Sequence, residues 1–483
     1  MDGRQLDLAV IGLYLAGTVA LAARFIRRSA TAEGFALGSR AIPTWAIGIS
    51  VLGTFVSSMS FVGNPGKAYS DNWAPLGFAL MTPLVGALAA HLFVPIYRGR
   101  GRISAYAFLE ERLGYWARVY GSASFLAIML GRVGIILYLV AIIIAPLLDL
   151  SIPAVILITG LIVTAYTLMG GMEAVIWTDV VQVAVMLGGT LWCLAEIIRL
   201  MPGGVQQAYQ IAAEAGGKFA LGDYRLSWSG QTVFGVALFG ITANLQNFGT
   251  DQNYVQRYLA ASSDRAARRM VMVGTLPFIP LTALFLMIGT GLFSFYRLNP
   301  SLLPPGTAGD MVFPHFIRTQ LPPGVSGLLV AAILAAAMST LSSNVNCMAT
   351  VFVEDFWKRF APGLPPRAHA NLLRGFTAVW GVAGTLLGLT MIGYRSGLDR
   401  FWEIVSIGGS GLLALFLLAA SGRALPVRAL QAAAVVVIVL VLIARIGYGV
   451  DALLAGAMGT VSLVAFGIAF SRPAPQKQLR SKL

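Results

Sequence analysis

Charged residues are scarce in this 483-residue chain: Asp, Glu, Lys and Arg together make up 11%, whereas hydrophobic residues make up 57%. A soluble domain usually carries about 25% charged residues, so the composition excludes a soluble enzyme, a nucleic-acid-binding domain and a disordered scaffold as first interpretations. Glycine and proline, at 54 and 22 residues, do not reach the levels of collagen or of disordered chains. The composition is that of a polytopic membrane protein.

Cysteine and histidine are rarer still. The two cysteines, Cys193 and Cys347, each lie in an apolar run, which is typical of small buried hydrophobic residues and not of a disulfide framework or a metal site. His91, His315 and His369 are widely spaced in the sequence and do not predict a metal cluster. The chain also lacks a phosphate-binding loop of the Walker type, so an ATP-driven pump is not expected.

Long apolar runs are abundant. A helix needs about 20 predominantly apolar residues to cross the hydrocarbon core of a bilayer. On this rule the sequence predicts an all-α polytopic membrane protein with about 13 transmembrane helices in one membrane domain. The predicted spans are 6–26, 43–66, 74–97, 118–147, 153–168, 173–200, 231–249, 271–296, 325–351, 375–393, 403–421, 428–447 and 451–470.

An odd number of spans places the termini on opposite sides of the membrane, and cytoplasmic loops retain Lys and Arg. With the N-terminus outside, 23 of the 34 Lys and Arg residues fall in or beside inner loops and nine in outer loops, while Arg132 and Arg199 lie within spans. The sequence therefore predicts a cytoplasmic C-terminus, in an inner or plasma membrane. The bias accounts for the net charge of +14 without a nucleic acid. Glu110–Glu111 and Glu354–Asp355 are expected to be solvated helix ends on inner loops.

Two spans, five apart in order, carry glycines and polar residues in their interior. The second contains Gly53, Gly63 and Pro65 around a cluster of serines, and the seventh contains Gly240 and Asn244 at matching depth. Paired broken helices at corresponding places in two halves predict inverted five-helix repeats with a binding site near the bilayer midplane. The alternative is that the glycines only allow helices to pack closely.

Hydroxyl groups line one face of the ninth span. Ser339, Ser342 and Ser343 follow the spacing i, i+3 and i+4, so they share one side of a helix. Such oxygens beside the free carbonyls of a broken helix suit a hard cation such as sodium. Asp179, at the inner end of the sixth span, would supply the negative charge that serines lack. The alternatives are serines that serve as small packing residues and an interfacial aspartate solvated from the cytoplasm.

Arg132 lies well inside the fourth span, where an ionised side chain costs several kcal/mol unless it is paired or faces water. Its planar guanidinium matches a carboxylate. The carboxylate belongs either to a substrate or to an internal acid such as Asp179.

Four stretches give the chain a resemblance to the sodium/solute symporters, and particularly to their sialic-acid transporter branch. The stretches are Phe61–Tyr69, Met169–Asp179, Thr250–Tyr258 and the serine face of the ninth span. The resemblance implies the fold of sodium-coupled symporters, with two inverted five-helix repeats, one leading helix and two trailing helices. It divides the chain into a leading helix (1–42), a first repeat (43–200), a second repeat (231–421), trailing helices (428–470) and a cytoplasmic tail (471–483).

The resemblance also implies sodium as the coupling ion and assigns its ligands. The first sodium site would consist of backbone carbonyls and hydroxyls from Gly53, Val56, Ala336, Ser339 and Thr340. The possible second site would consist of Asp179, Ser339, Ser342 and Ser343. One sodium ion per cycle is the alternative, in which Asp179 only tunes the first site.

The substrate positions match the sialic-acid branch less well. Ser57, Ser60 and Arg132 match positions that hold the substrate's carboxylate and neighbouring groups in that branch. Phe55, by contrast, stands where a small hydroxyl residue is expected, and Ala79 and Pro75 replace an amide and an aromatic. Loss of hydrogen-bonding groups matters for selectivity, so a carboxylated organic solute is a better prediction than sialic acid itself. Asn244, from the seventh span, completes the predicted substrate-binding set.

The predicted function is transport, with no enzymatic activity. Sodium would drive a small carboxylated solute, either sialic acid or a related acid, into the cell by alternating access. The protein would act as a monomer in the lipid bilayer. One alternative is a symporter for a neutral solute such as a sugar or proline, in which Arg132 is paired internally. A ligand sensor and a passive channel are further alternatives; a sensor would need a signalling domain, and only a short basic tail follows Phe470.

Overall fold

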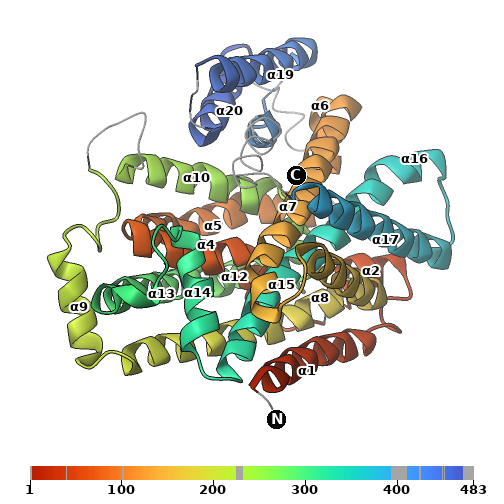
Figure 1. Ribbon diagram of the computed structural model, residues 1–483. Coiled ribbons are helices and arrows are strands. Elements are labelled where there is room, and N and C mark those ends of the chain that lie inside the picture. Colours follow the sequence, from red (N-terminus) through yellow and green to blue (C-terminus); the bar gives the residue numbers. More distant parts are fainter. Residues whose placement is uncertain are drawn as a thin grey trace.

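The computed structural model describes residues 3–39, 41–99, 103–224, 232–392, 409, 411–423, 426–448, 450 and 452–471. Within these residues the protein is helical, and its β-structure is limited to an isolated bridge between Asp223 and Thr232. The prediction of an all-α protein is therefore confirmed. The α-helices (Figure 1) are α1 (Gly3–Ala23), α2 (Ala32–Leu37), α3 (Thr44–Phe55), α4 (Ser58–Ser70), α5 (Ala74–Arg98), α6 (Ala107–Leu113), α7 (Tyr115–Leu148), α8 (Ile152–Arg199), α9 (Gly204–Glu214), α10 (Val233–Thr250), α11 (Gln252–Ala260), α12 (Asp264–Thr275), α13 (Phe278–Leu298), α14 (Gly309–Gln320), α15 (Val325–Phe352), α16 (Lys358–Phe360), α17 (Pro366–Thr390), a short helix Gly411–Ala420, α19 (Val427–Leu442) and α20 (Ala452–Ala469). A 3₁₀ turn, η1 (Pro300–Leu302), and two π-helical turns, η2 (Val353–Trp357) and η3 (Ile443–Gly447), complete the order.

In the described ranges, seven helices are long and apolar enough to cross a membrane, or eight if the bent pair α3 and α4 forms one span. Three further apolar helices are shorter. The difference from the 13 predicted spans has identifiable causes. Residues Ile152–Arg199 count once, as α8, although the backbone is non-helical at Gly171 and separates two helical parts where the predicted spans 153–168 and 173–200 meet. Helix α10 contains Asn244, Gln246 and Asn247, which lower its hydropathy.

The interruption expected in the second span is present. Helix α3 ends at Phe55, the backbone of Val56 and Ser57 is extended, and α4 starts at Ser58. The axes of the two helices are 59° apart. Because the last four carbonyls of a helix have no partner within it, this break leaves acceptor groups at the C-terminus of α3.

The interruption predicted inside the seventh span lies elsewhere in the structure. Helix α10 runs unbroken past Gly240 and Asn244 to Thr250, and the break falls at Asp251, outside the predicted span. The Asp251 carboxylate accepts a hydrogen bond of 2.8 Å from the backbone N–H of Asn253 and caps α11. A glycine costs about 1 kcal/mol in a helix but removes no hydrogen bond, whereas a capping side chain starts a new helix.

Helix α8 bends at Gly171, where φ is 58° and ψ is −150°. A side chain at this position would place its Cβ 2.5 Å from the carbonyl oxygen of Phe35 on α2, so both the positive φ and the contact require glycine. The bend lies between the predicted fifth and sixth spans.

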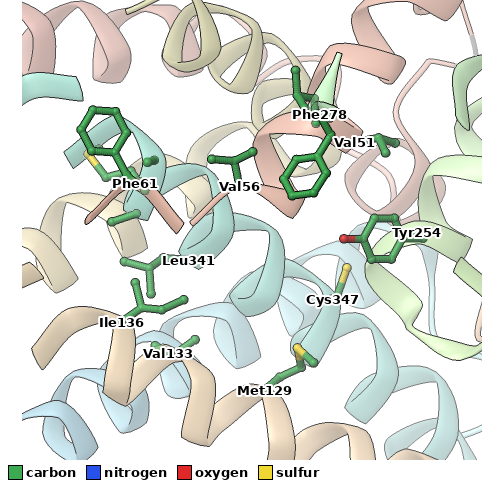
Figure 2. Close-up of a cluster of buried hydrophobic side chains, with 14 of the residues drawn as sticks. Val51, Val56, Phe61, Met129, Val133, Ile136, Tyr254, Phe278, Leu341 and Cys347 are labelled. Atoms are coloured by element: carbon green, nitrogen blue, oxygen red, sulfur yellow. The ribbon is translucent and has the colours of Figure 1, made fainter. Parts of the chain in front are cut away.

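Helix α15 occupies the interior of the bundle (Figure 1), where it packs against α8, α7, α1 and α17. Every residue from Leu329 to Val351 is buried. Apolar side chains of α4 and α7 lie near it, and Figure 2 shows Phe61, Val133 and Ile136 near Leu341. The predicted hydroxyl face is therefore inside the protein.

The N-terminus of α15 is held by the leading helix α1. The Asp7 carboxylate accepts hydrogen bonds from the backbone N–H groups of Gly324 (2.6 Å) and Gly327 (2.8 Å) and from the Ser326 hydroxyl (2.7 Å). These bonds satisfy donors that a helix N-terminus otherwise leaves without partners. At the other end of the chain, α19 and α20 pack on each other, and α20 contacts α10 (Figure 1).

Candidate functional site

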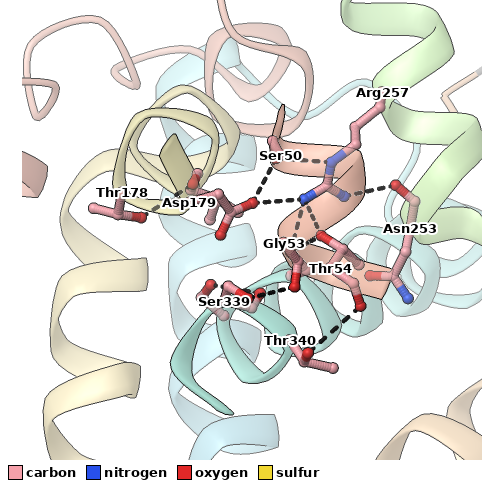
Figure 3. Close-up of polar contacts among 12 residues, drawn as sticks. Ser50, Gly53, Thr54, Thr178, Asp179, Asn253, Arg257, Ser339 and Thr340 are labelled. Carbon is pink, nitrogen blue, oxygen red and sulfur yellow. Dashed lines mark hydrogen bonds and ion pairs between the residues drawn. The ribbon is translucent and has the colours of Figure 1, made fainter. Parts of the chain in front are cut away.

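The hydroxyl face of α15 meets the C-terminus of α3 (Figure 3). The Ser339 hydroxyl donates to the carbonyl oxygen of Gly53 at 2.6 Å, and the Thr340 hydroxyl is 3.4 Å from the carbonyl oxygen of Thr54. The same two hydroxyls lie 3.5 and 3.4 Å from the carbonyl oxygen of Ala336. The structure thus brings four of the five predicted first-site residues together, and Val56 is buried in the extended segment where α3 ends.

Gly53 separates two groups of oxygens. A Cβ at this position would lie 3.6 Å from the Ser339 hydroxyl oxygen and 3.6 Å from Cβ of Asp179 on α8. Because Gly53 has no side chain, the predicted first site and the Asp179 side chain are near neighbours. Small uncharged oxygens and one carboxylate are a donor set that fits sodium.

Asp179 is completely buried, so the interpretation of an aspartate solvated from the cytoplasm is wrong. Its Oδ2 atom accepts a hydrogen bond of 2.5 Å from the Ser50 hydroxyl and forms an ion pair of 3.0 Å with Arg257. Its Oδ1 atom has no hydrogen-bond partner among the described residues. An unpaired carboxylate oxygen in a buried, polar setting is an unoccupied acceptor, which supports the fit of a cation.

Arg257, on α11, is the residue of this buried polar cluster that sequence reasoning missed. Its guanidinium is fully buried and donates to the Ser50 hydroxyl (2.9 Å) and to the Asn253 carbonyl (2.8 Å). It also donates to the hydroxyls of Thr54 (2.6 Å) and Ser343 (2.8 Å). Because Arg257 follows the seventh predicted span, the sequence places it in a loop. Its only sequence signal is its place within the stretch Thr250–Tyr258, which resembles the family.

The predicted second-site residues are brought close together, with Arg257 among them. Asp179 and Ser343 both contact its guanidinium, and the Ser343 hydroxyl is also 3.1 Å from that of Thr54. The Ser342 hydroxyl donates to the Ser339 carbonyl at 3.2 Å. The internal partner of Asp179 is therefore Arg257, and the alternative in which Arg132 pairs with Asp179 is wrong.

Arg132, on α7, is half-buried and forms no hydrogen bond or ion pair in the described part of the chain. The buried acid whose charge interacts with it is Asp251, yet the two side chains form no ion pair. Helix α7 packs against α4, whose first turn carries Ser60 and whose N-cap is Ser57. The Ser57 hydroxyl does not cap the helix.

Phe55 lies in an aromatic cluster and fills space that a small polar residue would leave open. Its ring centroid is 4.7 Å from that of Phe278, 5.8 Å from Phe248, 6.2 Å from Phe78 and 6.4 Å from Tyr254. The buried Ala79 is on the same helix as Phe78. These contacts make this side of the site apolar.

Asn244 is buried on α10, where its amide nitrogen donates to the Gly240 carbonyl at 2.6 Å. Its Oδ1 atom has no hydrogen-bond partner in the described ranges. Helix α10 packs against α5, α11 and α20, whereas Ser57, Ser60 and Arg132 belong to the contacting pair α4 and α7. The packing therefore does not group Asn244 with those three residues.

A separate polar network joins α6, α7 and η2. The Arg118 guanidinium forms ion pairs with Glu110 (2.5 Å) and Asp355 (2.6 Å), and Asp355 also accepts from the Ser104 and Ser122 hydroxyls. Asp355 is buried, so the expectation of a solvated helix end is wrong for this residue. The network borders a cavity of about 260 Å³, lined by Ile103, Ser104, Ala107, Arg118, Glu354, Asp355, Lys358 and Arg359.

Comparisons with known proteins agree with this architecture. The sequence profile of the Sodium:solute symporter family matches residues 35–421. The Sodium/sialic acid symporter SiaT of Proteus mirabilis is 31% identical over 478 residues, which cover 98% of this chain and 96% of the relative. The Sodium/sialic acid symporter NanT of Aliivibrio fischeri is 28% identical and covers 96% and 92%, respectively.

A solved structure gives the same result. The substrate-bound, outward-open structure of a Na⁺-coupled sialic acid symporter superposes with a TM-score of 0.91 at 30% identity, over 97% of this chain and 99% of the other. The chain belongs to the sodium:solute symporter family. It is a multi-pass membrane transporter and not an enzyme, and sodium is its coupling ion.

Proposed function

We propose that this protein carries a small carboxylated solute into the cell together with sodium, and that sialic acid or a related acid is the substrate. The observation that carries the proposal is Arg132. It is a half-buried guanidinium with no carboxylate partner within the described residues, whereas Asp179 is already paired with Arg257. A cation inside a membrane protein requires a partner or water, and a substrate carboxylate would supply the partner. The two sialic acid symporters among the relatives support the same substrate class.

The aromatic cluster around Phe55 limits how far the substrate of those relatives can be assigned to this protein. Phe55 contacts four other aromatic rings, and a ring offers a hydroxyl-rich sugar no hydrogen-bond acceptor. A site that lacks such groups discriminates less strongly among hydroxylated substrates. We therefore assign the carboxylate to Arg132, with Ser57 and Ser60 beside it, and an apolar part of the solute to the Phe55 side. Asn244 stays a candidate through its unsatisfied amide oxygen.

Sodium binding is proposed at two neighbouring places. The first consists of the carbonyls of Gly53, Val56 and Ala336 with the hydroxyls of Ser339 and Thr340. The contacts of 2.6 and 3.4 Å between α15 and α3 support it. The second consists of Asp179, Ser339, Ser342 and Ser343, and the free Oδ1 atom of Asp179 supports it.

Coupling follows from the position of the first site at the break between α3 and α4. Sodium bound there would fix the extended segment, and thereby Ser57 and Ser60, in one conformation. A solute that needs this conformation then binds more tightly, and the coupling free energy is reciprocal between ion and solute. The membrane potential contributes about 2.3 kcal/mol per charge per 100 mV, so two sodium ions would carry a monoanion inward.

The proposal extends to the number of transmembrane helices and their arrangement in repeats. We assign 13 transmembrane helices to a leading helix (1–42), two inverted five-helix repeats (43–200 and 231–421) and trailing helices (428–470), with 471–483 as a tail. The break between α3 and α4, inside the first helix of the first repeat, supports this arrangement, whereas the break in the second repeat follows its first helix, at Asp251. The bias of basic residues supports an N-terminus outside and a cytoplasmic C-terminus. The functional unit is a monomer in the bilayer.

The test is the thermal stability of the detergent-purified protein with carboxylated sugars, small organic acids and neutral solutes, in sodium and again in potassium. A ligand at a hundred times its dissociation constant adds about 2.7 kcal/mol. We expect stabilisation by a carboxylated solute in sodium alone, and its loss in Arg132→Ala. Stabilisation by a sugar or proline that survives Arg132→Ala would instead establish the neutral-solute alternative.

A further inference from the structure

The guanidinium of Arg257 contacts two of the four side chains that are proposed to bind the second sodium ion. One of its nitrogen atoms lies 3.0 Å from Asp179 Oδ2 and 2.8 Å from the Ser343 hydroxyl oxygen. These two side chains are half of the proposed second sodium site. A cation belonging to the protein is therefore already bound to two of the four side chains that an ion from solution would use, and Asp179 binds it through Oδ2 while Oδ1 stays free.

The contacts of Arg257 connect four helices around Asp179 (Figure 3). They reach α3 through Ser50 and Thr54, α8 through Asp179 and α15 through Ser343, while Arg257 itself is on α11. All of these side chains are buried. The same guanidinium therefore neutralises the carboxylate and holds the helices that contribute both proposed sodium sites.

The charges decide how sodium and Arg257 affect each other. Asp179 and Arg257 together are neutral, so a sodium ion added beside them would leave one positive charge uncompensated in a buried site. Burial of an unpaired charge is strongly unfavourable. If the guanidinium moves away, the carboxylate and the freed Ser343 hydroxyl are available, and the sum of charges at the site is again neutral.

We infer that Arg257 is a tethered competitor of sodium: it occupies the Asp179–Ser343 position when the second ion is absent, and that ion binds only as the guanidinium withdraws. This inference rests on the proposed second sodium site. It makes Arg257 a positioning residue that sets the sodium affinity of the transporter. It also couples ion binding to the contact of α11 with α3, α8 and α15.

The first experiment is direct binding of radioactive sodium to the purified protein in a choline background, without solute. Arg257→Gln removes the charge, Arg257→Lys retains it, and Arg118→Gln serves as the matched control. Arg118, on α7, pairs with the buried Asp355 of η2 at 2.6 Å and with Glu110 of α6 at 2.5 Å. We expect at least tenfold tighter sodium binding in Arg257→Gln, because charges a few Å apart at a buried site interact by more than the ~1.4 kcal/mol that a factor of ten represents. Arg257→Lys should stay near the wild type, and Arg118→Gln should equal it.

The second experiment needs no variant. Hydrogen exchange of the α11 amides is compared in sodium and in choline. We expect faster exchange in α11 with sodium, because its side-chain contacts to α8 and α15 are released, while α3 and α15 become more protected.

Each failure has a separate meaning. Unchanged or weaker sodium binding in a folded Arg257→Gln protein, or α11 protection that rises with sodium, overturns the competition. Absence of sodium binding to the wild type would contradict the proposed function itself. If Arg257→Gln does not fold, the exchange experiment decides.

Discussion

Gly53→Ala tests whether the space between Ser339 and Asp179 is a sodium site. The added methyl group would lie 3.1 Å from a methyl of Val183 and 3.6 Å from both the Ser339 hydroxyl oxygen and Cβ of Asp179. Overpacking costs ~1–3 kcal/mol, and the higher helix propensity of alanine returns about 1 kcal/mol. Without sodium we therefore expect a loss of at most about 2 kcal/mol in the free energy of unfolding.

The sodium-dependent part of the stability should change more clearly. At a sodium concentration a hundred times the wild-type dissociation constant, the ion adds about 2.7 kcal/mol. A methyl group between the oxygens should weaken binding at least tenfold, which leaves at most about 1.4 kcal/mol at the same concentration. The assay is the thermal unfolding of both proteins titrated with sodium in choline.

Gly188→Ala is the matched control for this substitution. Gly188 is an exposed residue on α8 with no atom within 4 Å of a built Cβ. Alanine there should stabilise the protein by ~0.5–1 kcal/mol and leave the sodium increment unchanged. An undiminished sodium increment in Gly53→Ala would refute the placement of sodium between α3 and α15.

Three further predictions concern other parts of the protein. Ser342→Ala should flatten the cooperativity of sodium-dependent transport, because one proposed ligand of the second site is lost; an unchanged sodium titration would leave one ion per cycle. Burial alone would raise the pKa of Glu110, but hydrogen bonds from Arg118 and Arg359 lower it below the ordinary 4.5. The ionised carboxylate therefore stabilises the fold at pH values above 4.5, and this stabilisation is lost as the pH falls through the folded-state pKa. Glu110→Gln should remove that part of the acid sensitivity in melting curves recorded over a series of pH values. An identical acid profile would contradict the ion-pair network. Asp7→Ala should cost ~0.5–2 kcal/mol, as the loss of a helix cap does, and Asp7→Asn should recover part of it in the same assay.

The sequence was informative where local pattern determines structure. The break near Phe55 and the shared face of Ser339, Ser342 and Ser343 follow from glycines, proline and helical spacing, and both are present. The family and the sodium dependence followed from four short stretches. The count of 13 spans stays a prediction, because three of the apolar helices are short and the two helical parts of α8, which meet at Gly171, count as one.

The missed and misplaced features depend on contacts between distant segments. Arg257 is 78 positions from Asp179, and no pattern in the nine-residue helix α11 indicates that its charged side chain is buried. Asp355 was expected to be solvated, but Arg118, 237 positions away, covers it. A charged side chain at the end of a helix is solvated only when no oppositely charged side chain from another part of the fold pairs with it.

The capping of α15 by Asp7 has a mechanical consequence. Three hydrogen bonds fix the first turn of α15 to α1, and a regular helix transmits that position along its axis at 1.5 Å per residue. The position of Ser339 along the helix axis relative to Gly53 is therefore set about 15 residues away, at the N-terminus of α15. A slip by one turn, 5.4 Å, would carry the hydroxyl out of reach of its carbonyl. The leading helix α1 thus fixes the axial position of α15, the helix that carries the proposed ion-binding oxygens.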